Sequence, residues 1–496
     1  MSLSIISLRP HALKVARMFS TTPHLHLPRK PAPPKDHLHQ PIPDSHFPQG
    51  YITTSTHCGI KKKAGILDLG VLLSTSPQTS AAACFTRNAF QAAPVLVSTE
   101  VLKQSEGRVR ALVVNSGCAN AVTGARGLKD AWAMAAATDM LARELTEFGG
   151  GYETVVMSTG VIGQHLPIQK ITDALASEQV KSGVGLSFGH WEGLARAFMT
   201  TDTFPKLRAR KFQLMGKEVK IAGIDKGAGM IHPNMGPPAL PHATLLGVIA
   251  TDAAVTPRSL QSALTYAVDR SFNSISVDGD MSTNDTVIAF ANGAAFSEDT
   301  AEIDQETHPE EYTQFRDHLT SFATELASLV VRDGEGATKF VTVSVEGAPT
   351  YADAHKVAST ISTSALVKTA LYGEDAKYVP SPLSPSPFAI SQTILPSSWG
   401  RILCAVGYTT LPSGTPINPT KVSVSFVPDQ GSPDQTPLPL LTNGEPEPAN
   451  EERASEILQR EDLEIRVQLG LGDESAKYYT CDFSHEYVTI NGDYRS

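Results

Sequence analysis

The chain has 496 residues, of which 41% are hydrophobic and 19% charged, so we expect two or more packed units with sizeable cores. No stretch approaches the roughly 20 apolar residues of a membrane-spanning helix, and the five cysteines form no Cys-x-x-Cys pair. These features exclude a membrane protein, a disulfide framework and a zinc knuckle, and the net charge of -10 argues against a nucleic-acid partner.

The N-terminal segment differs from the rest of the chain in charge. Residues 1–35 contain six lysines and arginines, and the first acidic residue is Asp36. A basic, Ser- and Thr-rich segment without acids is typical of a mitochondrial transit peptide, and a disordered basic tail is the alternative. We therefore expect 1–35 to be transit peptide and linker, and the protein to reside in the mitochondrial matrix. The histidines between 24 and 46 are expected in a solvated linker, not in a metal site.

Beyond residue 50, short β-branched runs alternate with helical patterns, which predicts a layered α/β (α+β) fold. The expected strands are 112–115, 154–157, 287–291, 340–345, 422–426 and 463–469. The expected helices are 128–148, one that starts at Pro257 with Thr256 as N-cap, and 309–331 with a buried apolar face. Pro- and Ser-rich stretches at 380–398, 411–420 and 427–449 are expected to be surface loops or excursions.

The common catalytic and nucleotide-binding motifs do not occur in this sequence. It contains neither Gly-x4-Gly-Lys-Ser/Thr nor His-Glu-x-x-His. A Gly-x-Ser-x-Gly match around Ser187 lacks the preceding strand that a nucleophile elbow needs, so we interpret it as chance. Cys118 has no evident His partner and is expected to be a small buried residue. No metal and no organic cofactor is expected.

Seven segments are instead dense in Gly, Thr and Asn. They are VNSGCANA (114–121), MSTGVIG (157–163), MTTDTFPK (199–206), DKGAGMIHPNM (225–235), HATLLGVIATDA (242–253), DGDMSTNDT (278–286) and DGEGATKF (333–340). Each alone could be a turn between a strand and a helix. Together they place many hydroxyls and backbone donors at loop ends, where active sites are commonly built.

In this order the segments resemble the ornithine acetyltransferase family of arginine biosynthesis, most nearly a fungal mitochondrial member. The resemblance extends from about residue 50 to the C-terminus. It implies a layered sandwich like that of self-cleaving aminopeptidases, and a cut before Thr244 that yields an α chain (36–243) and a β chain (244–496). It also implies acetyl transfer from N2-acetyl-L-ornithine to L-glutamate, acetyl-CoA as a possible co-substrate, and an α2β2 or larger assembly.

The residue chemistry suits an N-terminal threonine nucleophile. A hydroxyl is weak at neutral pH and needs a base, and the α-amino group created by the cut, with an ordinary pKa of about 7.7 to 8.0, can accept its proton. Attack of the Thr244 hydroxyl on the carbonyl of Ala243 would itself start the cut. A second Ala-Thr pair, at 250 and 251, is an alternative that the family pattern disfavours. The stretch 236–242 is longer than in many relatives, which leaves the cleavage rate open.

The resemblance assigns the remaining site residues. It implies that Thr159 and Gly160 form an oxyanion hole from one hydroxyl and one backbone N–H. The implied substrate contacts are Thr201, Lys226, Thr244, Glu335, Asn491 and Ser496. A cation at 226 suits an amino-acid carboxylate, and an anion at 335 suits the side-chain amine of ornithine. Thr200, which is adjacent, is an alternative to Thr201 as the substrate contact.

Two other functions are compatible with parts of this pattern. A self-cleaving N-terminal-threonine amidohydrolase or aminopeptidase would use water in place of glutamate as the acyl acceptor. A catalytically silent amino-acid sensor would retain the pocket but would be expected to lose the Ala-Thr or the Thr-Gly pair. Both pairs are present, which favours an enzyme.

Overall fold

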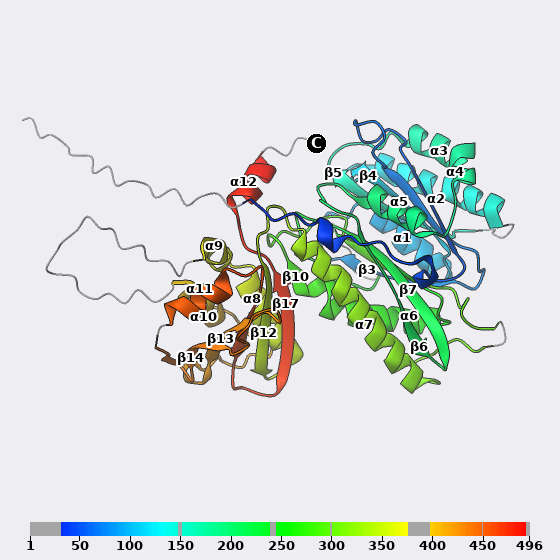
Figure 1. The fold of residues 1–496 in the computed structure, drawn as a ribbon. Coiled ribbons are helices and arrows are strands. Elements are labelled where there is room, and N and C mark those ends of the chain that lie inside the picture. The colour runs from blue at the N-terminus through cyan, green and yellow to red at the C-terminus, as the bar shows by residue number, and fades with distance from the viewer. Residues whose placement is uncertain are drawn as a thin grey trace, which may run out of the picture. The chain divides into compact units, whose positions relative to one another are not determined.

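A computed structural model describes residues 31–146, 151–238, 245–297, 300–374, 397–448 and 450–492. The described residues belong to one compact unit that contains three β-sheets (Figure 1). In the part of the chain that is described, no helix has the length and hydrophobicity to span a membrane. The expected transit segment up to residue 30, most of the expected loop at 380–398, and the expected cut site lie outside the described residues.

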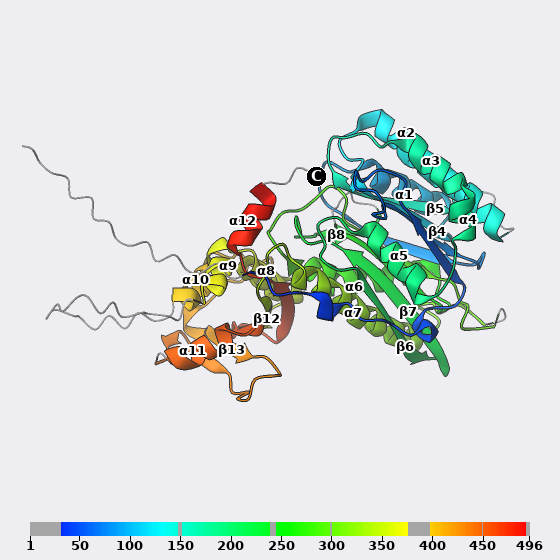
Figure 2. The same ribbon diagram turned by 45° about the horizontal axis from the view of Figure 1, so that its top comes forward.

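The four-stranded sheet has the order β1-β2-β4-β5, and its strands β4 and β5 are parallel. Its strands are β1 (Tyr51–Thr56), β2 (Leu69–Ser74), β4 (Ala111–Cys118) and β5 (Thr154–Val161). The helices of this region are α1 (Ala93–Gln104), α2 (Gly124–Thr146), α3 (Ile168–Ala176), α4 (Glu178–Ser182) and α5 (Phe188–Phe198). Helices α1 and α2 pack on β5, and α2 and α3 lie side by side (Figure 2).

The six-stranded sheet has the order β6-β7-β9-β11-β3-β8. Its strands are β6 (Lys206–Leu214), β7 (Lys217–Lys226), β9 (Leu246–Thr251), β11 (Thr286–Ala291), β3 (Ser80–Thr86) and β8 (Met235–Gly236). Along β11, Ile288 and Phe290 face the core shared with the four-stranded sheet, while Val287 and Ala289 face α6 (Pro257–Arg270) and α7 (Pro309–Arg332). This alternation buries both faces of the six-stranded sheet. Helix α5 contacts both this sheet and the four-stranded sheet. The arrangement confirms the expected layered α/β fold.

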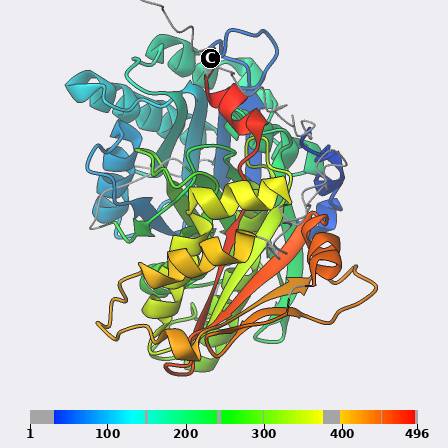
Figure 3. The same ribbon diagram turned by 90° about the vertical axis from the view of Figure 1, so that its left-hand side faces the viewer.

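The seven-stranded sheet has the order β10-β17-β12-β16-β13-β14-β15. Its strands are β10 (Ile275–Ser276), β17 (Glu474–Thr480), β12 (Phe340–Ala348), β16 (Asp462–Gln468), β13 (Ser423–Pro428), β14 (Leu438–Thr442) and β15 (Glu445–Pro446). Its helices are α8 (Tyr351–Ser362), α9 (Ala365–Gly373), α10 (Ser397–Gly407) and α11 (Glu451–Leu458). Helix α8 packs on β12 and β17 (Figure 3), and α12 (His485–Gly492) follows β17.

All six expected strands are present, four of them inside the observed strands and two displaced by one residue. Helix α2 begins four residues earlier than expected, at Gly124. The Thr256 side chain accepts the N–H of Ser259 at 3.3 Å and Pro257 opens α6, which confirms the predicted N-cap. The apolar face of α7 is buried as expected, with Phe315 and Phe322 at its centre.

The expectation of surface loops over 427–449 is wrong in part: 429–437 is irregular, as expected, but β14 and β15 form within 438–446. Leu438, Leu440 and Leu441 are buried there, and β14 pairs with β13. Proline is tolerated in sheets at edge strands and at irregular pairings, and here Pro446 belongs to the edge strand β15, while Pro439 pairs where the β13–β14 register shifts. The stretch 411–420 is irregular, as expected, up to a short 3-10 helix (Pro419–Lys421).

The segment that enters the unit from residue 31 is anchored to it at several points, although His37 is exposed, as a solvated linker predicts, and His39 and His46 are half-buried. Lys35 forms an ion pair of 2.7 Å with Glu461, and His39 lies 3.0 Å from a Glu192 oxygen. The Phe47 ring stacks on the Trp191 ring with centroids 5.3 Å apart. Within the described residues, no group of three or more His, Cys, Asp or Glu could hold a metal ion.

Candidate active site

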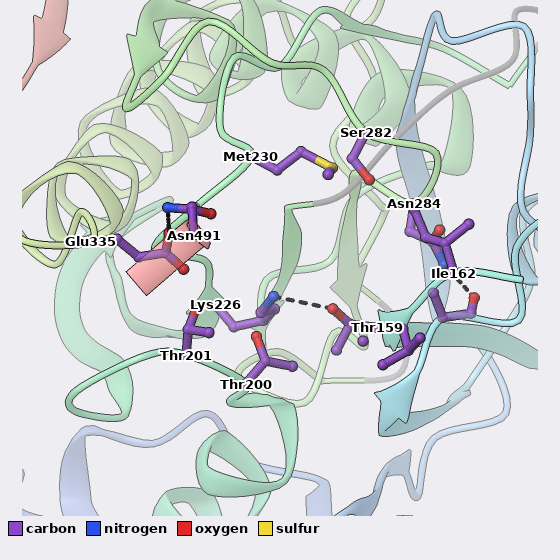
Figure 4. Close-up of a pocket in the computed structure, with 14 residues that line it drawn as sticks. Thr159, Ile162, Thr200, Thr201, Lys226, Met230, Ser282, Asn284, Glu335 and Asn491 are labelled. Carbon is purple, nitrogen blue, oxygen red and sulfur yellow. Dashed lines mark hydrogen bonds between the residues drawn. The ribbon is translucent and has the colours of Figure 1, made fainter. Parts of the chain in front are cut away.

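A cavity of about 290 Å³ lies where the ends of several strands meet loops and α12 (Figure 4). Its lining includes five residues that the resemblance assigned without an alternative, namely Thr159, Gly160, Lys226, Glu335 and Asn491. They come from the end of β5, the end of β7, the loop after α7, and α12. The fold thus brings together residues that are more than 300 positions apart in the chain.

Of the other expected site residues, the structure describes only some. Ala243, Thr244 and Ser496 lie outside the described residues. The described chain resumes at Leu245, and the next residue, Leu246, pairs with Lys226 across β9 and β7. Thr200 and Thr201 both line the cavity, so the choice between them remains open.

The end of β5 has a backbone that only glycine fits. The β4–β5 ladder becomes irregular at Gly117, opposite Gly160. Gly160 has φ of +127°, and a Cβ at this position would lie 2.4 Å from the carbonyl carbon of Gly117. A side chain would therefore both strain the backbone and clash with it. The neighbouring Thr159 is buried, with a side chain that lines the cavity.

Lys226 donates a hydrogen bond from Nζ to Oγ1 of Thr159 at 3.1 Å (Figure 4). An ammonium group can only donate, so the Thr159 oxygen is the acceptor and its own hydrogen is not used in this bond. Lys226 is 4% exposed. Burial lowers its pKa, Lys206 acts in the same direction, and Asp202 opposes both. One of the three ammonium hydrogens is used on Thr159.

A buried ion triad supports this side of the cavity. Lys206 Nζ lies 2.6 Å from a carboxylate oxygen of Asp202 and 2.6 Å from one of Asp333, and all three side chains are at most 1% exposed. Burial alone would lower the pKa of Lys206, but the two carboxylates outweigh it and raise that pKa. Asp202 also accepts the N–H groups of Thr200 and Gly227 at 2.9 and 2.8 Å. The triad therefore fixes the backbone at Gly227, next to Lys226, and at Thr200 in the segment after α5.

Glu335 and Asn491 form the opposite wall. Asn491 donates from Nδ2 to Oε2 of Glu335 at 2.7 Å. A Cβ on Gly229 would lie 2.4 Å from the same oxygen, so the glycine makes room for the carboxylate. The Tyr487 hydroxyl on α12 donates to Asp278 at 3.3 Å, which helps to hold the helix beside the cavity. A carboxylate at this position can bind a cationic ligand group.

Sequence reasoning assigned no role to residues of the DGDMSTNDT segment, yet several of them hold the site together. Asn284 lines the cavity and donates from Nδ2 to the carbonyls of Ala119 (2.7 Å) and Ser158 (2.8 Å), beside Thr159. Asp278 accepts the N–H groups of Met230 and Ile231 at 2.5 and 2.9 Å. The available signal was a run of polar residues directly before a buried strand, but no pairwise partner can be deduced from it.

The ArgJ family model matches residues 52–380 and 396–496. The chain belongs to the ArgJ family. It is 63% identical over 475 residues to the Arginine biosynthesis bifunctional protein ArgJ, mitochondrial, of Postia placenta, covering 94% of this chain and 96% of the relative. The protein of the same name from Coprinopsis cinerea is 58% identical over 498 residues, covering 97% and 99%.

Two solved structures are also similar to this chain. The ArgJ protein of Bacillus halodurans is 34% identical, covering 49% of this chain and 96% of that chain, with a TM-score of 0.39. The ornithine acetyltransferase of Mycobacterium tuberculosis, complexed with ornithine, is 34% identical, covering 38% and 94%, with a TM-score of 0.33. As an ArgJ-family member the chain is a bifunctional enzyme of arginine biosynthesis, and the relatives' names confirm the predicted mitochondrial location.

Two motifs that the sequence analysis set aside have no catalytic arrangement in this ArgJ-family chain. Cys118 is buried, its thiol donates to the Gln164 carbonyl at 3.3 Å, and burial raises its pKa, which confirms a small buried residue. Ser187 precedes α5 without a strand before it, and its hydroxyl lies 2.8 Å from Nδ1 of His190 one turn later. The Gly-x-Ser-x-Gly match is thus a helix start, not a nucleophile elbow.

A second cavity of about 450 Å³ lies beyond the loop that contains Met230. It is lined in part by His232 and His355. Nδ1 of His232 lies 3.1 Å from the Tyr478 hydroxyl, and burial lowers the pKa of His232 to about 4. This imidazole is therefore neutral at physiological pH.

Proposed function

We propose that this site transfers the acetyl group of N2-acetyl-L-ornithine to L-glutamate, giving L-ornithine and N-acetyl-L-glutamate, and that acetyl-CoA serves as a second donor. Membership in the ArgJ family supports the reaction class. The observation that carries the proposal is the convergence of Thr159, Gly160, Lys226, Glu335 and Asn491 on one cavity. The site uses no metal and no organic cofactor, because acyl transfer needs only a nucleophile, a base and oxyanion donors.

The nucleophile in this proposal is Thr244, generated by self-cleavage. Its hydroxyl oxygen attacks the carbonyl carbon of Ala243, the C–N bond between the two residues breaks, and the nitrogen takes up a proton to become an amine. Water then hydrolyses the resulting ester to leave a carboxylate on Ala243. Leu245 and Leu246, which follow Thr244, lie where β9 meets the end of β7 at Lys226, which supports this assignment.

The transfer cycle uses the new α-amino group as the base. It accepts the Thr244 hydroxyl proton while the oxygen attacks the acetyl carbonyl, and it returns the proton to the ornithine nitrogen as the C–N bond breaks. Glutamate then attacks the acetyl-threonine ester with its neutral α-amine and regenerates Thr244. In both halves the carbonyl oxygen becomes negative, and the Thr159 hydroxyl with the Gly160 N–H would stabilise that charge.

Charge complementarity supports the proposed substrate contacts. The Glu335 carboxylate would bind the side-chain ammonium of ornithine, with Asn491 and Ser496 closing over it. The Lys226 hydrogens not used on Thr159 would face the substrate carboxylate, together with the hydroxyl of Thr201 or Thr200. In the six-stranded sheet, β9 and β11, which follow residue 244, lie between β7 and β3, which precede it, so the two fragments would remain one folded protomer in the proposed α2β2 assembly.

An acyl-acceptor assay tests the proposal. Purified protein is given N2-acetylornithine with and without glutamate, and ornithine, N-acetylglutamate and acetate are quantified. We expect N-acetylglutamate to form in equal amount to ornithine, and Thr244→Ala to abolish both products. Ornithine with an equal amount of free acetate in the presence of glutamate would identify a hydrolase instead and overturn the proposal.

A further inference from the structure

The backbone of Leu245 is held on both sides by two consecutive residues at the start of β11. Its N–H donates to the carboxyl group of Asp285, and its carbonyl accepts the N–H of Thr286 at 2.5 Å. The parallel ladder between β9 and β11 begins one residue later, with Leu246 opposite Thr286. At Leu245 a side-chain oxygen therefore takes the place of the backbone acceptor that a longer ladder would supply.

Asp285 is a buried acidic residue next to the cavity. It is 1% exposed, and Asn284, the residue before it, lines the cavity. Burial raises the pKa of Asp285 well above its ordinary value, and the positive charge of Lys226 opposes this. Burying a carboxyl group is costly unless its oxygens are used. The contact that the structure shows for one of these oxygens is the peptide group next to the expected nucleophile.

We propose that Asp285 is a positioning residue for Thr244. By accepting the N–H of Leu245, it fixes the peptide group that follows the nucleophile and so aims the Thr244 hydroxyl in both self-cleavage and acetyl transfer. The proposal rests on the proposed function of Thr244. A displacement of about 1 Å at a reacting group can cost on the order of 100-fold in rate, so one such hydrogen bond is sufficient for a measurable effect.

Two substitutions separate the hydrogen bond from the charge. Asp285→Asn keeps a carbonyl oxygen at the same distance from the backbone and removes the acid. Asp285→Ala removes the acceptor altogether. We expect Asp285→Ala to lower the self-cleavage rate and the kcat of transfer by about 100-fold with KM changed by less than about threefold, and Asp285→Asn to retain both rates within about fivefold.

Asp225 provides the matched control. Like Asp285 it is 1% exposed and acts on the charge of Lys226, but its side chain makes no hydrogen bond to Leu245 in the described part of the chain. Asp225→Ala should therefore leave cleavage and kcat within about fivefold of wild type. Should Asp285→Ala fail to fold, Asp285→Leu, which keeps a branched side chain without an acceptor, takes its place, and thermal melting verifies that the variants compared are folded.

The outcomes are distinguishable. The positioning role is supported if self-cleavage and transfer are slow in Asp285→Ala or Asp285→Leu but close to wild type in Asp285→Asn and in Asp225→Ala. Equal losses in Asp285→Asn and Asp285→Ala would show that the acid and not the acceptor matters, and equal losses in Asp225→Ala would show a general effect of charge or packing. Either result overturns the inference while leaving the proposed function intact. A wild-type chain that neither cuts before Thr244 nor transfers acetyl would overturn both.

Discussion

The two walls of the cavity are built in different ways. The floor, formed by Thr159, Gly160 and Lys226, consists of strand ends, and buried charges fix the backbone around it. The rim, formed by Glu335 and Asn491, consists of a loop and the C-terminal helix, which are joined by a side-chain hydrogen bond of 2.7 Å. The groups that would act on the reacting carbonyl are therefore held by the sheets. The groups that would bind the substrate's amino-acid side chain are held by a loop and the C-terminal helix.

The largest effect is expected from breaking the triad beneath the floor. Lys206→Met leaves the carboxylates of Asp202 and Asp333 buried without their cation, which should lower the free energy of unfolding by about 3 to 5 kcal/mol. Chemical denaturation measures this change. Arg258→Ala, which removes an ion pair whose side chains are 67% and 63% exposed, is the control and should cost less than about 1 kcal/mol. Equal losses would contradict a special role for the triad.

The next effect concerns chemistry at the floor. Thr159→Ala removes one proposed oxyanion donor and should reduce kcat by about 100-fold with little change in KM, and it should slow self-cleavage as well, because both reactions place negative charge on a carbonyl oxygen. Thr159→Ser keeps the hydroxyl and should retain most of the activity. Steady-state kinetics and the time course of chain cleavage measure the two effects. A rise in KM alone would make Thr159 a substrate contact.

A smaller effect is expected from the loop that runs from Met230 on the cavity wall to His232 behind it. The pKa of His232 is lowered to about 4 in the folded protein, so the imidazole is neutral there, whereas the unfolded chain takes up a proton below about pH 6.5. Stability is therefore lost as the pH falls, by about 2 kcal/mol at pH 5. Denaturation of wild type and His232→Gln at pH 7.5 and 5 should show a smaller loss in the variant, and identical losses would refute this account.

The smallest effect is expected at the rim. Asn491→Ala should leave self-cleavage unchanged and lower kcat/KM for N2-acetylornithine by about tenfold, since one polar contact to Glu335 is lost. Deleting residues 491–496 should lower kcat/KM further, because Ser496 is lost as well. Comparing cleavage and transfer in the same preparations tests this separation. Full transfer activity in the cleaved truncated protein would show that the chain end is not part of the site.

Much of the fold could be predicted because its strands are short β-branched runs and its helices carry local signals. Thr256 before Pro257 and the apolar spacing in α7 need no distant partner to be recognised. The hairpin at 438–446 was missed for the opposite reason. Its prolines and short apolar run indicate a loop locally, and the strands exist because β13 offers a pairing partner.

The site was predictable in composition but not in its contacts. Motifs around Thr159, Lys226, Glu335 and Asn491 identified residues that do line one cavity. The hydrogen bond from Lys226 to Thr159 and the contacts of Asn284 and Asp285 could not be deduced, because they join side chains or backbone groups on separate strands. Such contacts depend on the register of β7, β9 and β11, which no local pattern encodes.

Intact-mass analysis of the purified protein, before and after addition of N2-acetylornithine without glutamate, tests the central claim most directly. We predict two fragments, the second beginning at Thr244, and the gain of one acetyl group on that residue, which is lost when glutamate is added. Thr244→Ala should give a single chain that gains nothing. A fragment that begins at Thr251, or a cleaved protein that transfers acetyl to glutamate without acetylation of Thr244, would contradict the account.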